Sequence, residues 1–517
     1  MMLEKNVLRK RRERVGMLFL LCALFCTSCR APVRPSSSQE ICFAVDTRFR
    51  FEDLNPFGGV RYIAFQPLFG ALYSSLLALD GEGKLQNRLL ESEVRQGRVV
   101  TLTLKKGIRF SDGSAITSRD LLWSLIDSFL VPRPNPLYTV VEGGEETVTK
   151  GERFCRGLSV IDERTLRITL KEEGDRYRLF LAQVGNPVLP EGGLRRRWAF
   201  SGPFYVEKFS PGEGGTLVVL RRNRFFQGPW PGNIERVHFH FFDSPALFEK
   251  EVEMGHPDLF FNFRSPELPK MGRGSPYLVY RTPFSGGVYL LLNPKREALS
   301  NPRLRRRIRD IIDGAQFVKR HGWITYIPSQ HILPNALKES RLFRYPERER
   351  ESVVVGKRAR KMVYLSYEYG IRNQLFQYLK ERLAGLGIEL EKRVVERERY
   401  WADFDRADFD ITAIYHLMDV ADSFSFFESV FLPGMGMNSV SRVPEADALL
   451  AVMRRERDPI KRIGILNALE NIAQRESFFL PLVTPVSVIG YKKKVRGLRL
   501  SCTMELPFQE LSVAKNH

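Results

Sequence analysis

The chain has 517 residues, of which 43% are hydrophobic and 27% charged, and its formal net charge is +20. This length exceeds what a single hydrophobic core organises, so we expect two or more domains, and the composition excludes a disordered or fibrous protein. The basic side chains are spread along the chain rather than gathered in one arm, which favours solvated faces over a nucleic-acid site.

The N-terminus reads as an export signal followed by a lipidation site. Residues 1–28 run from a basic stretch into an apolar segment too short to cross a bilayer, which is typical of a secretory signal peptide. Thr27 and Ser28 precede Cys29, and this segment resembles the bacterial lipobox. We therefore expect an acylated Cys29 held in a lipid bilayer, with residues 29–40 as a tether. Ordinary signal cleavage nearby is the alternative.

Export also makes disulfides possible. Three cysteines follow the lipidation site, at Cys42, Cys155 and Cys502. Because three is an odd number, at most one bridge forms and one thiol is left over. The sequence does not identify the pair.

In the first half of the body, short strands surround one well-marked helix. Thr117 followed by Asp120 forms a capping box, and the apolar residues from Leu121 to Phe129 then fall on one helical face. Period-two alternation and apolar runs predict strands at 41–45, 99–104, 217–223 and 237–242, and a hairpin at 158–170.

In the second half, helices and strands alternate. We expect a basic helix at 304–318, a strand at 362–366, a helix at 373–383, a strand at 386–390 and another at 409–414. Alternation of this kind in both halves favours α/β lobes.

Five segments match one protein family in order. They are FGALYSSLLALDGEGKLQNRLLES, LTLKKGIRFSDGSAITSRDLLWS, SGPFYVEKFSPG, LLLNPKREALSNPRLRRRIRDIIDG and FFLPLVTPVSVIGYKKKVRGL. The match as a whole runs from about residue 41 to about residue 500, and the chain resembles the extracytoplasmic peptide-binding proteins of ATP-driven importers, the dipeptide/oligopeptide-binding solute-binding family 5. The second segment is the most specific of the five.

The resemblance implies an α/β fold of the two-lobed periplasmic binding protein type, in the large peptide-binding variant with an extra domain and a hinged cleft. Lobe I would combine residues 41–72, 199–285 and 484–517, and lobe II would be residues 286–483. The extra domain, residues 73–198, would pack on lobe I. Peptide would lie between the lobes, and hinge closure would enclose it.

The resemblance also implies a ligand-binding segment at the end of one strand. In the family an acid after this strand receives the ligand's ammonium group, and Asp419 stands at that position, with Tyr415 and His416 before it and Asp422 as a neighbour. Enclosing an ammonium in a closed cleft demands a carboxylate. His416 replaces the family's usual tryptophan, and the prolines of its turn are missing. A surface loop whose acids pair with nearby arginines is the alternative.

Other functions find less support. His238 and His240 share a strand face but lack a third ligand, so we expect no metal site and no cofactor. No catalytic motif for an enzyme is present. We expect a monomer that delivers peptide to a membrane permease with ATPase subunits and binds no nucleic acid. A nickel chelate, haem or sugar as the ligand, or a basic surface adhesin or nucleic-acid binder, remain alternatives.

Overall fold

The structure is a computed structural model that describes residues 39–514, except 58–62, 80–84, 132–133, 136, 183–186, 263–274, 344–359, 369, 419–420, 433–436 and 457. The predicted signal peptide, Cys29 and most of the tether lie outside the described residues, as does Asp419. The predicted α/β class is confirmed, because helices and strands alternate along the chain.

Twelve strands of the described part form one large sheet, in the order β16-β15-β17-β13-β18-β11-β1-β10-β9-β8, while β12 and β14 also pair with β18. The strands that the sequence predicts at 41–45, 217–223, 237–242 and 362–366 all belong to it. Its strands are β1 (Glu40–Val45), β8 (Phe204–Gly212), β9 (Gly215–Arg222), β10 (Arg236–Phe242), β11 (Leu259–Phe261), β12 (Tyr277–Pro283), β13 (Gly286–Leu292), β14 (Tyr326–Pro328), β15 (Arg360–Ser366), β16 (Ile388–Val394), β17 (Ile411–Leu417) and β18 (Phe479–Lys492).

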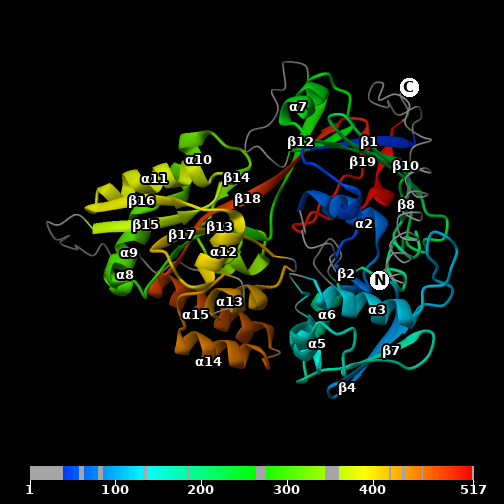
Figure 1. Cartoon of the computed structure of the whole chain (residues 1–517), viewed down its shortest axis with the longest axis horizontal. Helices are drawn as coiled ribbons and strands as arrows, with labels where there is room; N and C mark the ends of the chain where they lie inside the picture. Colours follow the sequence, from blue (N-terminus) through cyan, green and yellow to red (C-terminus); the bar gives the residue numbers. More distant parts are fainter. Residues whose placement is uncertain are drawn as a thin grey trace, which may run out of the picture.

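The long strand β18 joins the two halves of this sheet (Figure 1). Its first residues pair with β13, and its last residues pair with β11 and β12. The chain crosses a second time between β12 and β13, where Pro283 pairs with Val486 and the Phe284 amide donates to the Pro485 carbonyl over 3.0 Å. Two adjacent strands therefore connect the halves, which is the geometry that a hinge needs.

The half of the sheet around β13, β15 and β17 is covered by helices on both faces. Along β13, Tyr289 and Leu291 belong to one buried core, while Val288, Leu290 and Leu292 belong to another. The strand is apolar throughout because both of its faces are buried. The helices of this half are α8 (Glu297–Ser300), α9 (Pro302–Ile311), α10 (Gly314–His321), α11 (Arg372–Ala384), α12 (Arg397–Asp405), α13 (Ser423–Phe431), α14 (Pro444–Met453) and α15 (Pro459–Glu476).

The half around β1 has its own core, which also includes residues near the C-terminus. The strong apolar character of β1 follows from its position between β10 and β11, where all six residues are buried. The remaining elements of this half are α2 (Gln66–Leu72), α7 (Pro245–Glu253), β19 (Val495–Arg496) and β20 (Ser512–Val513), with short 3-10 turns at Phe51–Leu54, Ile63–Phe65 and Phe508–Glu510.

A smaller sheet, in the order β4-β5-β7-β6, forms the lower right part of Figure 1. It has a separate core of residues between Leu76 and Ala199. The predicted capping box is confirmed at the start of α3, where Thr117 and Asp120 exchange hydrogen bonds. We call this part the small-sheet domain. Its elements are β4 (Leu90–Gln96), β5 (Val99–Leu104), β6 (Leu158–Val160), β7 (Thr165–Thr169), α3 (Ser118–Phe129), α4 (Leu137–Val140), α5 (Gly144–Lys150) and α6 (Arg176–Leu181), and the pair β2 (Leu77–Leu79) and β3 (Leu85–Asn87) precedes them.

The single helix predicted at 304–318 is wrong, because two helices occupy this range. The first helix ends at Ile311, and Asp313 caps the second, accepting from the amides of Ala315 and Gln316 at 2.8 and 3.2 Å. The break brings Gly314 so close to β18 that an added Cβ would lie 2.0 Å from the Leu482 carbonyl oxygen. The apolar residues of the sequence keep their helical spacing across this break, so periodicity alone could not reveal it.

The three described cysteines, Cys42, Cys155 and Cys502, are all free thiols. No disulfide therefore forms among them. Burial raises the pKa of the Cys42 thiol to about 12, so this thiol stays protonated and unreactive at neutral pH.

Candidate functional site

The predicted ligand-binding segment begins at the carboxyl end of β17. This strand runs parallel to β15, with Tyr364 opposite Ile411 and Leu365 opposite Thr412. It extends three residues beyond the predicted end, so Tyr415 and His416 are strand residues. The carboxyl ends of neighbouring parallel strands lie at one edge of a sheet, and in open α/β sheets ligands bind at that edge.

This edge lies at the crossing between the two halves of the large sheet. The Met418 amide donates to the Ser285 carbonyl over 2.8 Å, and Ser285 lies in the crossing between β12 and β13. The Ser285 amide in turn donates to the Cys502 carbonyl over 3.0 Å. The candidate segment is therefore hydrogen-bonded through Ser285 to the C-terminal region of the other half.

His416 and Asp422 are both half-buried, and they are held differently. The His416 ring lies 6.1 Å from the Phe426 ring of α13, measured between centroids. Asp422 is the N-cap of α13, and its carboxylate accepts from the amide and hydroxyl of Ser425 at 2.8 and 2.7 Å. The Asp422 carboxylate therefore has hydrogen-bond partners within the protein, whether or not a ligand is bound.

Asp419 lies outside the described residues, so its role as the acid that meets a ligand stays a prediction. The nearest described residues on either side of it are Met418 and Ala421. Met418 is buried at the crossing, and Ala421 packs against the core on the α13 side.

A buried arginine that the sequence analysis missed adjoins this segment. Arg372, the first residue of α11, is 2% exposed, and its guanidinium carbon lies 4.2, 5.0 and 4.8 Å from the ring centroids of Tyr367, Tyr400 and Tyr415. Cations are attracted to the faces of aromatic rings at these distances.

No carboxylate of the described residues forms an ion pair with Arg372, and its Nε and Nη1 atoms are buried without a hydrogen-bond partner. A buried charge without a counter-ion is costly, so this position is suited to receive a negative group. Nothing in the sequence separates Arg372 from the other 79 of the 80 lysines and arginines, because only folding places it beneath Tyr415.

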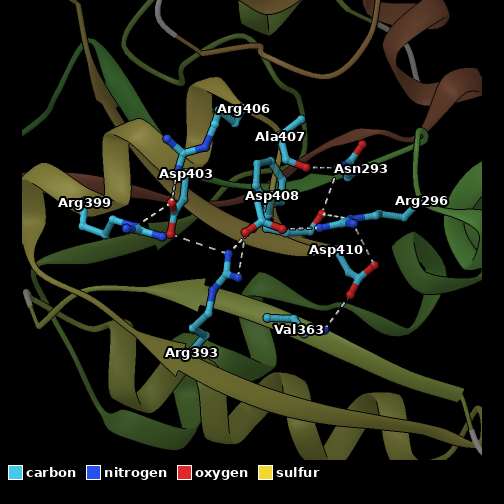
Figure 2. Close-up of polar contacts among 11 residues, drawn as sticks. Asn293, Arg296, Val363, Arg393, Arg399, Asp403, Arg406, Ala407, Asp408 and Asp410 are labelled. Atoms are coloured by element: carbon cyan, nitrogen blue, oxygen red, sulfur yellow. Dashed lines mark hydrogen bonds and ion pairs between the residues drawn. The ribbon is translucent and has the colours of Figure 1, made fainter.

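The opposite end of β17 carries a dense polar network (Figure 2). Asp408 accepts from Arg296 at 2.7 Å and from Arg393 at 2.9 Å, and Asp410 accepts from the Val363 amide at 2.7 Å. These acids therefore serve the fold at the start of the strand, away from the candidate segment at its other end.

A turn in this network is held by Asn293, which is fully buried. Ala407 has a φ of 56°, in the left-handed region that favours glycine. The Asn293 side-chain amide donates to the carbonyls of Ala407 and Phe409 at 2.9 and 2.8 Å, which fixes this turn. The turn sets where β17 begins and hence where Tyr415 ends up.

The strand histidines have structural surroundings. The His238 ring lies 3.1 Å from a Glu40 carboxylate oxygen, and both side chains are largely buried. Burial, followed by the nearby His238, lowers the pKa of His240 to about 4. A search of the described residues finds no cluster of three His, Cys, Asp or Glu side chains that could hold a metal ion. In the same part of the chain, no helix combines the length and the apolar character needed to cross a membrane.

Comparison with known proteins identifies the family. The family described as bacterial extracellular solute-binding proteins, family 5 Middle, matches residues 84–438. The glutathione-binding protein GsiB of Escherichia coli K12 is 20% identical over 490 residues, which cover 89% of this chain and 92% of that protein.

Two solved structures share the fold over nearly their whole length. The Haemophilus influenzae OppA complex with the peptide RPPGFSPFR has a TM-score of 0.72 at 17% identity, covering 92% of this chain and 99% of OppA. The Escherichia coli murein tripeptide-binding protein MppA has a TM-score of 0.73 at 16% identity, covering 94% and 100%. The expected two-lobed architecture is thereby confirmed. The chain belongs to family 5 of the bacterial extracellular solute-binding proteins, the binding proteins of ATP-driven importers.

Proposed function

We propose that this protein captures peptides outside the cytoplasm and delivers them to the permease and ATPase subunits of an importer. It performs no chemical reaction. The ligand lies between the two halves of the large sheet, with Asp419 facing its positive end and Arg372 its negative end. Tyr415 and His416 line the same edge.

The observation that supports this proposal best is the buried guanidinium of Arg372 beneath Tyr415, which pairs with no carboxylate in the part of the chain that the structure describes. A free peptide carries an ammonium at one end and a carboxylate at the other. A cleft that encloses it needs one fixed charge of each sign, since charges removed from water must be paired. The aromatic rings around Arg372 offer contacts that do not depend on one particular side chain.

The relatives agree with this class of ligand. The OppA structure holds a nine-residue peptide, the MppA name specifies a tripeptide, and the GsiB name specifies glutathione. A peptide or a peptide-like solute is common to these names. We therefore include glutathione beside short peptides among the ligands to be tested.

We also propose the remaining features that the sequence predicts. Residues 1–28 direct export, Cys29 is acylated, and residues 29–40 tether the protein to the membrane. The chain divides into lobe I (41–72, 199–285 and 484–517), an extra domain (73–198) and lobe II (286–483), and the protein acts as a monomer.

The ligand class is tested by identifying what the protein binds. Mass spectrometry of solute released from the purified protein should find peptides. Mixed peptides at moderate salt should raise the midpoint of thermal unfolding, since a ligand at 100 times its Kd stabilises the folded state by about 2.7 kcal/mol. Release of a nickel chelate, haem or sugar would replace the peptide proposal, and binding of nucleic acid that collapses with salt would indicate the basic-surface alternative.

The role of Asp419 is tested by Asp419→Ala, with Asp422→Ala as the matched control. Asp419→Ala should weaken peptide binding by about 2–5 kcal/mol, as when one partner of an enclosed charge pair is removed. Asp422→Ala removes a helix cap, so it should lower the free energy of unfolding by about 1 kcal/mol with a much smaller effect on affinity. Calorimetry that finds equal peptide affinity in Asp419→Ala and the unmodified protein would remove Asp419 from the site.

A further inference from the structure

One ion pair links the small-sheet domain to the half of the large sheet that carries the candidate site. Arg176 lies on α6, and its Nη2 donates to Oε2 of Glu428 on α13, while Nη1 lies 3.4 Å from Oε1. The two residues are 252 positions apart in the sequence. Their helices meet across the lower middle of Figure 1, where α6 faces α13.

The two helices are anchored in different cores. Tyr177, Phe180 and Leu181 bury one side of α6 in the core of the small-sheet domain, so Arg176 is presented away from that core. Phe426 and Phe427 bury α13 in a core of the other half, beside Glu428. A movement that separated the two helices would break this ion pair and leave both cores intact.

The Glu428 carboxylate is buried and is oriented by a second arginine, Arg454. The Glu428 side chain is 3% exposed, and Arg454 at the end of α14 donates to Oε1 from Nη2 and Nε at 3.0 and 3.3 Å. Arg454 belongs to the same half as Glu428, so it keeps the carboxylate oriented when Arg176 is absent. Arg176 then adds a two-pronged contact, the strong form of a charge-assisted hydrogen bond.

Two aromatic rings and a hollow surround the contact between Arg176 and Glu428. The Arg176 guanidinium carbon also lies 4.8 Å from the Phe424 ring of α13 and 5.6 Å from the Phe180 ring of its own helix. Beside it the two parts leave a hollow of about 470 Å³ between Glu172 and the end of α14. The ion pair and these two rings are contacts that can separate while the cores on either side stay buried.

The position of α13 connects this contact to the candidate site. The helix starts directly after its cap Asp422, three residues beyond Asp419. The segment expected to meet the ligand and the carboxylate that meets Arg176 are thus on one continuous piece of chain, with Glu428 inside the helix that the cap begins.

We propose that Arg176 and Glu428 form a closure contact, which holds the small-sheet domain against the half of the sheet carrying β17 and so keeps the ligand cleft shut. The contact forms when the two halves rotate together about the paired crossing strands, and it breaks when they open. Arg454 keeps Glu428 in place between these states. The proposal goes beyond ligand capture, because it concerns the equilibrium between open and closed protein.

Small-angle scattering of the purified full-length protein without added ligand tests the proposal independently of the ligand's identity. Arg176→Gln and Glu428→Gln should both shift the population toward the open form and raise the radius of gyration. The closed-to-open ratio should fall about tenfold or more, because Arg176→Gln removes a contact of two charge-assisted hydrogen bonds.

Arg178→Gln is the matched control. Arg178 lies on the same helix and pairs with Glu93 of its own domain at 3.1 Å, so its loss should leave the scattering curve unchanged. The midpoint of thermal unfolding is measured for the same variants, because loss of an ordinary structural ion pair would lower that midpoint without changing the scattering curve. The proposal is overturned if the scattering curve of Arg176→Gln superimposes on that of the unmodified protein, as the curve of Arg178→Gln is expected to do. This holds even if Arg176→Gln lowers the midpoint of thermal unfolding.

Discussion

At the scale of single residues, the charges near β17 divide into those that the fold explains and those that it does not. Asp422 caps α13, and Asp408 and Asp410 hold the start of β17. Arg372 has no such explanation, because among the described residues it is surrounded by tyrosine side chains and pairs with no acid. Buried charges without partners are typical of sites where a ligand completes the pairing.

The proposed role of Arg372 is tested by comparing the affinities for peptides with a free and with an amidated C-terminus. Arg372→Met should weaken binding of peptides with a free C-terminal carboxylate by about 2–5 kcal/mol, the cost of leaving one enclosed charge unpaired. It should scarcely change the affinity for the same peptides with an amidated C-terminus. Calorimetry with each acid–amide pair measures the difference within one variant, so any loss of stability cancels.

Arg305→Met is the control for replacing a buried arginine. Arg305 is 4% exposed and donates to the carbonyls of Glu476 and Leu299 at 2.8 and 2.9 Å. Its replacement should lower the free energy of unfolding and leave the preference for the acid over the amide intact. An unchanged preference in Arg372→Met would exclude Arg372 from the ligand's negative end.

At the scale of elements, the sequence predicted the existence of helices and strands better than their ends. The capping box of α3 is local, so Thr117 and Asp120 alone identified its start. The corner between α9 and α10 is not local, because Gly314 is required by its approach to Leu482, far along the chain. The end of β17 is likewise set by pairing with β13, where Gly286 lies opposite Leu417.

The corner predicts opposite effects for two helical glycines. Gly314→Ala would place a Cβ 2.0 Å from the Leu482 carbonyl oxygen, so the backbone must shift, and we expect a loss of about 1–3 kcal/mol in the free energy of unfolding. Gly464, inside α15, has no atom within 4 Å of an added Cβ. Gly464→Ala should therefore stabilise the protein by about 0.5–1 kcal/mol, as measured by urea unfolding. Equal effects of the two substitutions would contradict the packing at this corner.

The network at the start of β17 predicts a dependence on pH. Hydrogen bonds from Arg296 and then Arg393 lower the pKa of Asp408. A carboxyl whose folded pKa is lowered stabilises the fold above its ordinary pKa of about 3.9, and the contribution disappears as the pH falls through the folded pKa. Asp408→Asn should cost about 0.2–1 kcal/mol at pH 7, because the side chain is 45% exposed, and progressively less below pH 4.

Urea unfolding across this range measures the effect of Asp408. Asp405→Asn is the control, since Asp405 is exposed and forms no ion pair among the residues that the structure describes. A difference between Asp408→Asn and the unmodified protein that stays constant from pH 7 to pH 3 would show that the arginines do not act on this carboxylate.

At the scale of the whole molecule, segments distant in sequence build each half of the large sheet. The core around β1 combines residues near the N-terminus with a C-terminal stretch that returns after β18. The small-sheet domain, by contrast, has a core drawn from one continuous stretch between Leu76 and Ala199. The two parts should therefore respond differently to the loss of the C-terminus.

Deleting residues 495–517 tests this organisation. The deletion removes seven buried apolar side chains, each worth about 1.5–3 kcal/mol, and should unfold the β1 half while the small-sheet domain keeps its own unfolding transition. Differential scanning calorimetry distinguishes the transitions, and a chain ending at residue 514 is the control. A truncated protein with undiminished unfolding enthalpy would contradict this division. The seven side chains are Val495, Leu500, Met504, Leu506, Phe508, Leu511 and Val513.

The sequence by itself determined the α/β class, most of the strands, the start of α3 and the family, because these depend on periodicity, local capping and motifs that remain readable along one stretch of chain. Only the tertiary structure decided that Arg372 lies beneath Tyr415, that Glu428 meets Arg176, and that the chain turns a corner between α9 and α10. The first two join residues far apart in the sequence, and the break is required by the approach of Gly314 to Leu482, so all three depend on burial and on partners that no local pattern records.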